Sequence, residues 1–118
     1  MLNLVDIKND RDLINAIDWD MTPEEAVRLY LEWGCNWARS NYVIRSPQDV
    51  AHYFVVYSWD DTPVIYLIKR NSEEAVELAK INPPKHIRDN LLKEYGKLKG
   101  VFAIEGDVKN WLKKELLN

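Results

Sequence analysis

One thiol and two imidazoles are the side chains of this sequence best suited to nucleophilic or metal chemistry. They belong to Cys35, His52 and His86. A Cys–His nucleophile requires contact in space, and no local motif surrounds the cysteine in the stretch WGCNW. A structural zinc site requires four ligands at short spacing, which one cysteine cannot supply. The sequence therefore predicts no catalytic residue, no cofactor and no metal site, and both histidines are interpreted as surface or capping residues.

Closely spaced carboxylates are the next group with potential chemistry. Asp18, Asp20, Glu24 and Glu25 lie within eight positions of one another. Such carboxylates can hold Ca²⁺ or Mg²⁺, but the spacing of a calcium loop, with its glycine, is missing. Helix capping and solubility explain these acids better.

Aromatic side chains are the features best suited to recognition, with five Trp, six Tyr and two Phe among 118 residues. Trp19 and Trp59 are flanked by acids and turn residues, which favours a partner surface. Tyr53, Tyr57 and Tyr66 share one face of a predicted hairpin and could line a pocket, stack on bases or lie buried. Few basic residues accompany them, so burial or partner docking is favoured over nucleic-acid binding.

Composition and missing motifs exclude several classes of protein function. No Walker loop, Gly-x-Gly-x-x-Gly, His-Glu-x-x-His or Gly-x-Ser-x-Gly stands in the chain, which has four glycines. The net charge of −3 argues against a global basic field for nucleic acid. No apolar run approaches the roughly 20 residues of a membrane span, and no secretory signal is visible. We expect a cytoplasmic, single-domain protein over residues 1–118.

The elements that would position these side chains follow from capping and periodicity. Thr22-Pro23-Glu24-Glu25 is typical of a capped helix start, and the apolar stripe begins with Val27 and Tyr30 and is widened by Ala26 and Leu29. Strands are expected at 52–59, 64–70 and 100–104, with an optional edge strand at 42–45, and helices at 10–17, 22–33, 71–81, 84–95 and from 106 onward. The pattern predicts an α+β fold with a small, mainly antiparallel sheet, a central hairpin plus a third strand, packed by about four helices.

The hairpin has a predicted register and two apolar faces. With residues 60–63 as its loop, Tyr57 would pair with Tyr66 and Val55 with Ile68. One face would carry Tyr53, Val55, Tyr57, Trp59, Val64, Tyr66 and Ile68, and the other Phe54, Val56, Ser58, Ile65, Leu67 and Lys69. A hairpin with no polar face is either central in the sheet or exposes a binding surface.

Four stretches together resemble a known group of sequences. They are 17–34, which contains IDWDMTPEEAV, then YFVVYSWD at 53–60, RNSEEA at 70–75 and LKGV at 98–101. The chain resembles a family of small uncharacterised bacterial proteins found mainly in sulfate-reducing and related anaerobes. That family has no assigned activity, cofactor or site. The resemblance implies a bacterial cytoplasmic protein linked to anaerobic metabolism.

Three functions fit the sequence. A non-catalytic accessory or protein–protein interaction protein is favoured by small size, missing motifs, abundant rings and split charge. Residues 80–118 hold nine of the 16 basic residues and five of the 19 acids. This asymmetry could steer an acidic partner or bring copies together head to tail, but a solvated helix surface explains it better. The alternatives are a small-molecule-binding or sensor domain with a pocket lined by Tyr53, Tyr57 and Tyr66, and an enzyme of dispersed residues with Cys35, His52 and Tyr57 as its best candidates.

Overall fold

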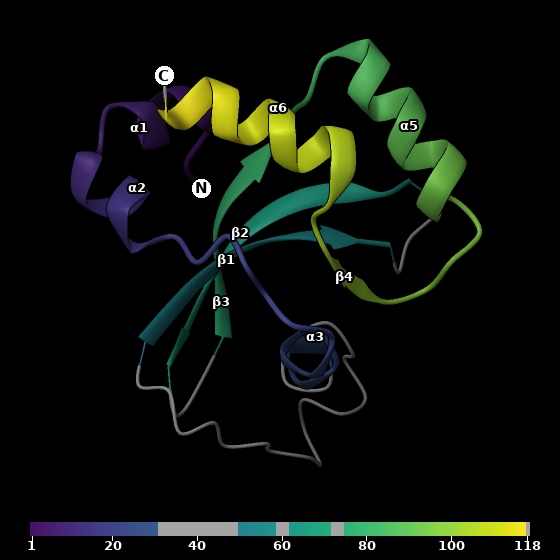
Figure 1. Ribbon diagram of the computed structural model, residues 1–118, viewed down its shortest axis with the longest axis horizontal. Coiled ribbons are helices and arrows are strands. Elements are labelled where there is room, and N and C mark those ends of the chain that lie inside the picture. The colour runs from purple at the N-terminus through teal and green to yellow at the C-terminus, as the bar shows by residue number, and fades with distance from the viewer. Residues whose placement is uncertain (31–49, 59–61, 72–74, 118) are drawn as a thin grey trace.

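The computed structural model describes residues 1–30, 50–58, 62–71 and 75–117, and its centre is an antiparallel sheet (Figure 1). The four strands lie in the order β3-β2-β1-β4. Their bounds are β1 Val50–Tyr57, β2 Val64–Asn71, β3 Ala75–Ile81 and β4 Val101–Ala103. The predicted α+β class is therefore confirmed, with one more strand than the sequence indicated.

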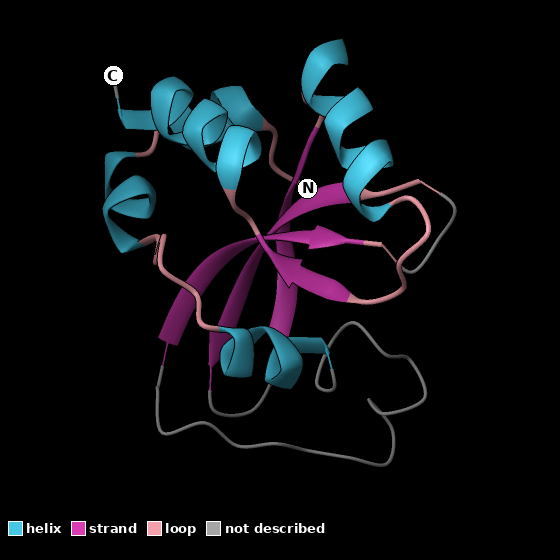
Figure 2. Cartoon of the chain, turned by 45° about the vertical axis from the view of Figure 1, so that its right-hand side comes forward, coloured by secondary structure: helices cyan, strands magenta, loops and turns pink. Residues whose placement is uncertain are grey.

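Helices cover both faces of this sheet, as Figures 1 and 2 show from two directions. The helices of the described residues are α1 Leu4–Lys8, α2 Arg11–Ala16, α3 Pro23–Leu29, α5 Lys85–Tyr95 and α6 Gly106–Leu117. All but α3 pack on one face, where their buried side chains meet Phe54, Val56, Ile65 and Leu67 in the larger core cluster. Among the described helices, only α3 lies on the other face, where Leu29 packs in a smaller cluster. None of these helices is long and apolar enough to cross a lipid bilayer.

The two faces of the hairpin are as predicted, but its register is not. Tyr57 pairs with Val64, and Val55 with Tyr66, so the pairing is displaced by two residues from the predicted one. The connection between the strands is correspondingly longer than four residues. Because side chains alternate with a period of two, a two-residue shift leaves the described side chains of the hairpin on their predicted faces.

The segment predicted as a helix after Asn71 is instead the edge strand β3. Ala, Glu, Leu and Lys favour helices in isolation, but Ala79 and Ile81 are buried in the sheet, where they oppose Leu67 and Ile65 of β2. Leu2 adds a parallel bridge to Ala79 and covers part of the outer edge of this strand. Tertiary pairing has overridden the local preference.

Most of the predicted helix signals are confirmed. Thr22 is the N-cap of α3 and accepts from the Glu25 amide, while Asp10 caps α2 in the same way. The predicted stripe of α3 is wrong at its first residue, because Val27 is 59% exposed, whereas Leu29, which was expected only to widen the stripe, is fully buried. Among the helices of the described residues, α1 alone was not predicted from the sequence. The predicted strand at 42–45, and the continuation of the α3 helix beyond residue 30, lie outside the described residues.

Candidate functional site

The residues that the sequence singled out for recognition lie on both faces of the sheet. Tyr53 is buried at 2% exposure beneath α3, and Trp19 is half-buried against the larger core cluster on the opposite face. Tyr57 and Tyr66 are half-buried beside Tyr53, with their rings edge to face at 5.8 Å. Trp59 lies outside the described residues. The structure therefore brings the three tyrosines together and separates them from Trp19.

The abundance of rings does not produce a single aromatic cluster among the described residues. The Trp19 ring lies 5.5 Å from that of Phe54, and the Lys113 ammonium stands 5.8 Å from the indole centroid. Tyr95 and Phe102 form a separate pair at 5.2 Å. These contacts are packing and cation–π contacts between neighbouring elements, so the expected enrichment of rings at one surface is not supported.

Tyr53 is the centre of a polar contact at the base of α3. Its hydroxyl donates to a Glu25 carboxylate oxygen at 2.6 Å, and Glu25 also accepts from the Thr22 hydroxyl. Burial, followed by the hydrogen bond to Glu25, raises the pKa of Tyr53 well above its ordinary value. The phenol is thus held as a neutral donor that ties α3 to β1, and it cannot act as a base near neutral pH.

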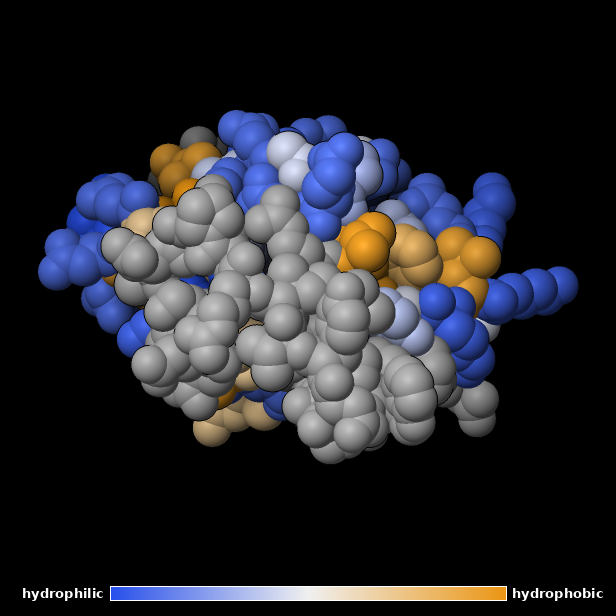
Figure 3. All heavy atoms as spheres, turned by 90° about the horizontal axis from the view of Figure 1, so that it is seen from below, coloured by the Kyte–Doolittle hydropathy of each residue, from blue (hydrophilic) through white to orange (hydrophobic). Residues whose placement is uncertain are grey.

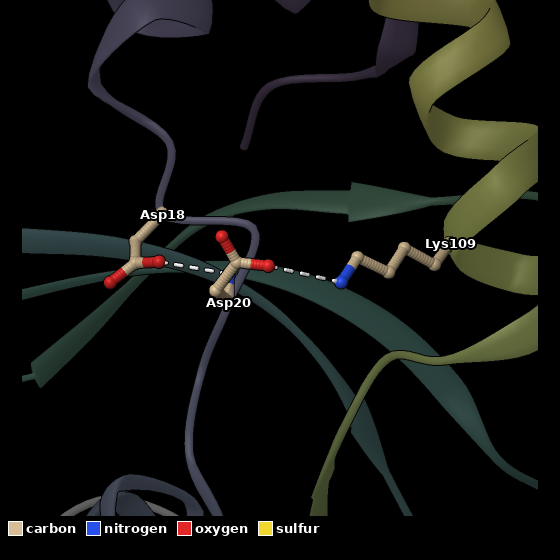
Figure 4. A network of polar contacts seen from close by, with 3 residues as sticks. All are labelled: Asp18, Asp20 and Lys109. Carbon is tan, nitrogen blue, oxygen red and sulfur yellow. Dashed lines mark hydrogen bonds and ion pairs between the residues drawn. The ribbon is translucent and has the colours of Figure 1, made fainter.

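The acids at 18 and 20 have structural partners as well (Figure 4). Asp18 accepts from the Asp20 amide at 2.9 Å, which closes a turn between α2 and α3. An Asp20 oxygen lies 3.4 Å from the Lys109 ammonium of α6. Within the described ranges, no three His, Cys, Asp or Glu side chains are grouped so that they could hold a metal ion.

The dispersed catalytic set is not assembled on one face. His52 and Tyr57 lie at opposite ends of β1, and their odd spacing places them on opposite faces of the sheet. Burial, and then the positive charge of the opposing Lys69, lowers the pKa of His52 below its ordinary value. His86 is exposed in the first turn of α5. Cys35, the remaining candidate, lies outside the described residues.

A hollow at one corner of the fold was not predicted. It has a volume of about 450 Å³ and lies between the start of β2, the end of β3 and the exposed side of α5. We call it the α5 hollow, and its lining residues are Thr62, Pro63, Val64, Lys80, Ile81, Asn82, Pro83, Lys85, Arg88, Asp89 and Leu92. Its volume falls in the range of sites that take ligands or anchor side chains.

The α5 hollow combines an apolar wall with a charged rim. Ile81 is buried at its floor, and Leu92 is 48% exposed at its side. The rim carries Lys80, Lys85 and Arg88 against a single acid, Asp89. The sequence held one signal of this site, the excess of basic residues after position 80, but three separate segments form the hollow and no local pattern joins them.

A second hollow, of about 420 Å³, lies between the N-terminal helices and the end of α6. Its lining mixes Lys8, Arg11 and Glu115 with the apolar Val5 and Leu117, which are 62% and 53% exposed. An ion pair between Lys8 and Glu115 at 3.4 Å already joins its two sides. In the described part of the surface seen from below, apolar patches lie beside hydrophilic side chains (Figure 3).

Comparison with protein-family models, with curated proteins and with solved structures finds no match for this chain.

Proposed function

We propose that this protein is a non-catalytic interaction protein that docks a partner protein at the α5 hollow. The observation that carries the proposal is the combination of an exposed leucine, Leu92, with a cationic rim around an apolar floor. Apolar anchors that insert into such a hollow supply much of the affinity of protein interfaces, and a polar rim excludes water around them.

The disposition of the chemically competent side chains supports a binding role over catalysis. Tyr53 is engaged by Glu25, and His52 lies on the opposite sheet face from Tyr57. Asp20 is engaged by Lys109. Tyr53 and Asp20 thus serve the contacts between elements.

The resemblance to small bacterial proteins of anaerobes extends the proposal to location and role. We place the protein in the bacterial cytoplasm, as an accessory to an enzyme or complex of anaerobic metabolism. Nothing in the proposal requires nucleic acid or a membrane, and self-association remains one form that the partner can take.

The test compares two leucines of similar exposure. Leu92 lies at the α5 hollow and Leu117 at the second hollow, with 48% and 53% of their surface exposed. In the source organism, native mass measurement should find the tagged chain in an assembly larger than its own 13.9 kDa. Leu92→Glu should release it as a free chain, whereas Leu117→Glu should leave the assembly intact.

Two outcomes contradict the proposal. One is a wild-type chain found only as a free monomer. The other is an assembly that survives Leu92→Glu and is lost with Leu117→Glu. Circular dichroism of both purified variants controls for folding, because both leucines are about half exposed and their replacement should change stability little.

A further inference from the structure

The rim of the α5 hollow carries a charge opposite to that of the whole chain. Three of its side chains are cationic and one is anionic, whereas the chain as a whole has a net charge of −3. Lys85 is engaged by Asp89 at 3.1 Å, one turn along α5. In the part of the chain that the structure describes, Lys80 and Arg88 are exposed and form no ion pair. Arg88 extends from α5, whereas Lys80 follows the alternation of β3 and projects from the sheet face opposite to that of Ile81, so the two cations flank the hollow from different sides.

The wall between these cations is apolar. Pro63 and Ile81 are buried, while Val64 and Pro83 are half-buried and Leu92 is exposed. An apolar side chain seated there would be removed from water, which favours binding in proportion to the apolar area that is buried. The hollow therefore favours a ligand that combines an apolar side chain with a negative charge close to it.

We infer that the partner presents an acidic peptide segment, in which one apolar anchor side chain is flanked by Asp or Glu. The anchor occupies the α5 hollow between Ile81 and Leu92, and the flanking carboxylates face Lys80 and Arg88. This inference rests on the proposed interaction function and names the chemistry of the partner at the same site. Charge complementarity selects the acidic segment over a basic one, which would meet two like charges.

Short synthetic peptides test the inference directly. The probe is a fluorescent peptide with one central leucine flanked by glutamates. Its controls are the same peptide with lysines in place of the glutamates, and the same peptide with serine in place of the leucine. Only the acidic peptide with leucine should bind, and its amide chemical-shift changes on the labelled protein should centre on residues 80–92.

Charge reversal on the protein supplies the second measurement. The double variant Lys80→Glu with Arg88→Glu should weaken binding of the acidic peptide by about tenfold, since each exposed charge pair contributes a factor of a few. Lys97→Glu with Lys114→Glu, which reverses two exposed charges outside the hollow, is the matched control and should change binding less than about twofold. Added salt should weaken wild-type binding and affect the double variant much less.

The outcomes separate this inference from the interaction function on which it rests. Equal binding of the acidic and basic peptides, or no binding of either, overturns the acidic partner, while loss of the native assembly with Leu92→Glu alone would still support docking there. Saturation of the α5 hollow by octanoate, with no binding of any peptide, would also overturn the inference in favour of a small-molecule site. Binding of the acidic peptide at residues outside 80–92 would contradict the assigned site.

Discussion

The hydroxyl of Tyr53 on β1 donates a hydrogen bond of 2.6 Å to the carboxylate of Glu25 on α3. This contact joins the one helix on its face of the described structure to the centre of the sheet. Its acceptor is charged and its donor is buried, which places it among the stronger hydrogen bonds of a protein. Because its hydroxyl is hydrogen-bonded to Glu25, Tyr53 is not available to bind a ligand, the role that the sequence analysis considered for it.

Replacement of Glu25 measures the strength of this contact. Glu25→Gln should lower the free energy of unfolding by about 1–2 kcal/mol, because the charge-assisted bond is replaced by a weaker one. Glu24→Gln is the matched control, since it removes an exposed acid from the same first turn without touching Tyr53. Chemical denaturation gives both values. Equal losses would mean that only the helix dipole is affected.

The raised pKa of Tyr53 predicts a specific alkaline instability. The folded state holds the phenol neutral, whereas the unfolded chain releases its proton near pH 10. This contribution is complete below pH 10 and is lost as the pH rises toward the folded-state pKa, at up to about 1.4 kcal/mol per pH unit. Denaturation of wild type and Tyr53→Phe should show a shallower decline in the variant above pH 10. Parallel declines would contradict the assignment.

Ser58 forms a second buried polar contact, whose contribution to stability can be measured. Its side chain is fully buried, and its hydroxyl lies 2.7 Å from the Tyr95 carbonyl oxygen and 3.0 Å from that of Leu98. Ser58→Ala should cost about 0.5–1.5 kcal/mol, because it removes the hydrogen bond of a buried hydroxyl, while the Tyr95 carbonyl still accepts from the Leu98 amide. Thr62→Ala, an exposed hydroxyl deletion, should change stability by less than about 0.5 kcal/mol. A neutral Ser58→Ala would show that water replaces the hydroxyl.

Gly106 begins α6 with a backbone φ of +58°. A Cβ at this position would meet nothing within 4 Å, so any cost of substitution arises from the backbone and not from a clash. Gly106→Ala should destabilise by about 1–2 kcal/mol, and Gly106→Asn by less, because asparagine tolerates the left-handed region better. Thermal unfolding measures both, and equal stability of all three proteins would place Gly106 in a different conformation.

The parts of the fold that local chemistry specifies could be predicted from the sequence. Thr22 followed by Pro23 specifies the start of α3, and the period of two places Phe54 and Tyr53 on opposite faces whatever the register. β3 could not be predicted, because the alanine and glutamate content of residues 75–81 favours a helix and only pairing with β2 makes it a strand.

The site was harder to predict than the fold. The aromatic residues offered as a recognition surface are partly core, as Tyr53 shows, because large rings serve packing and docking equally well. The α5 hollow arises where residues 62–64, 80–85 and 88–92 converge, and such convergence depends on sheet order. The excess of basic residues after position 80 could be read from the sequence, but the position of these residues beside an apolar wall could not.

The central claim is that the α5 hollow is the docking surface, and site-specific photo-crosslinking in the source organism tests it most directly. A photoreactive amino acid is placed at position 92 in one strain and at position 117 in another, since both native leucines are exposed to a similar degree. We predict one discrete crosslinked partner from position 92 and none from position 117. A partner captured only from position 117, or the same partner captured equally from both, would contradict the account.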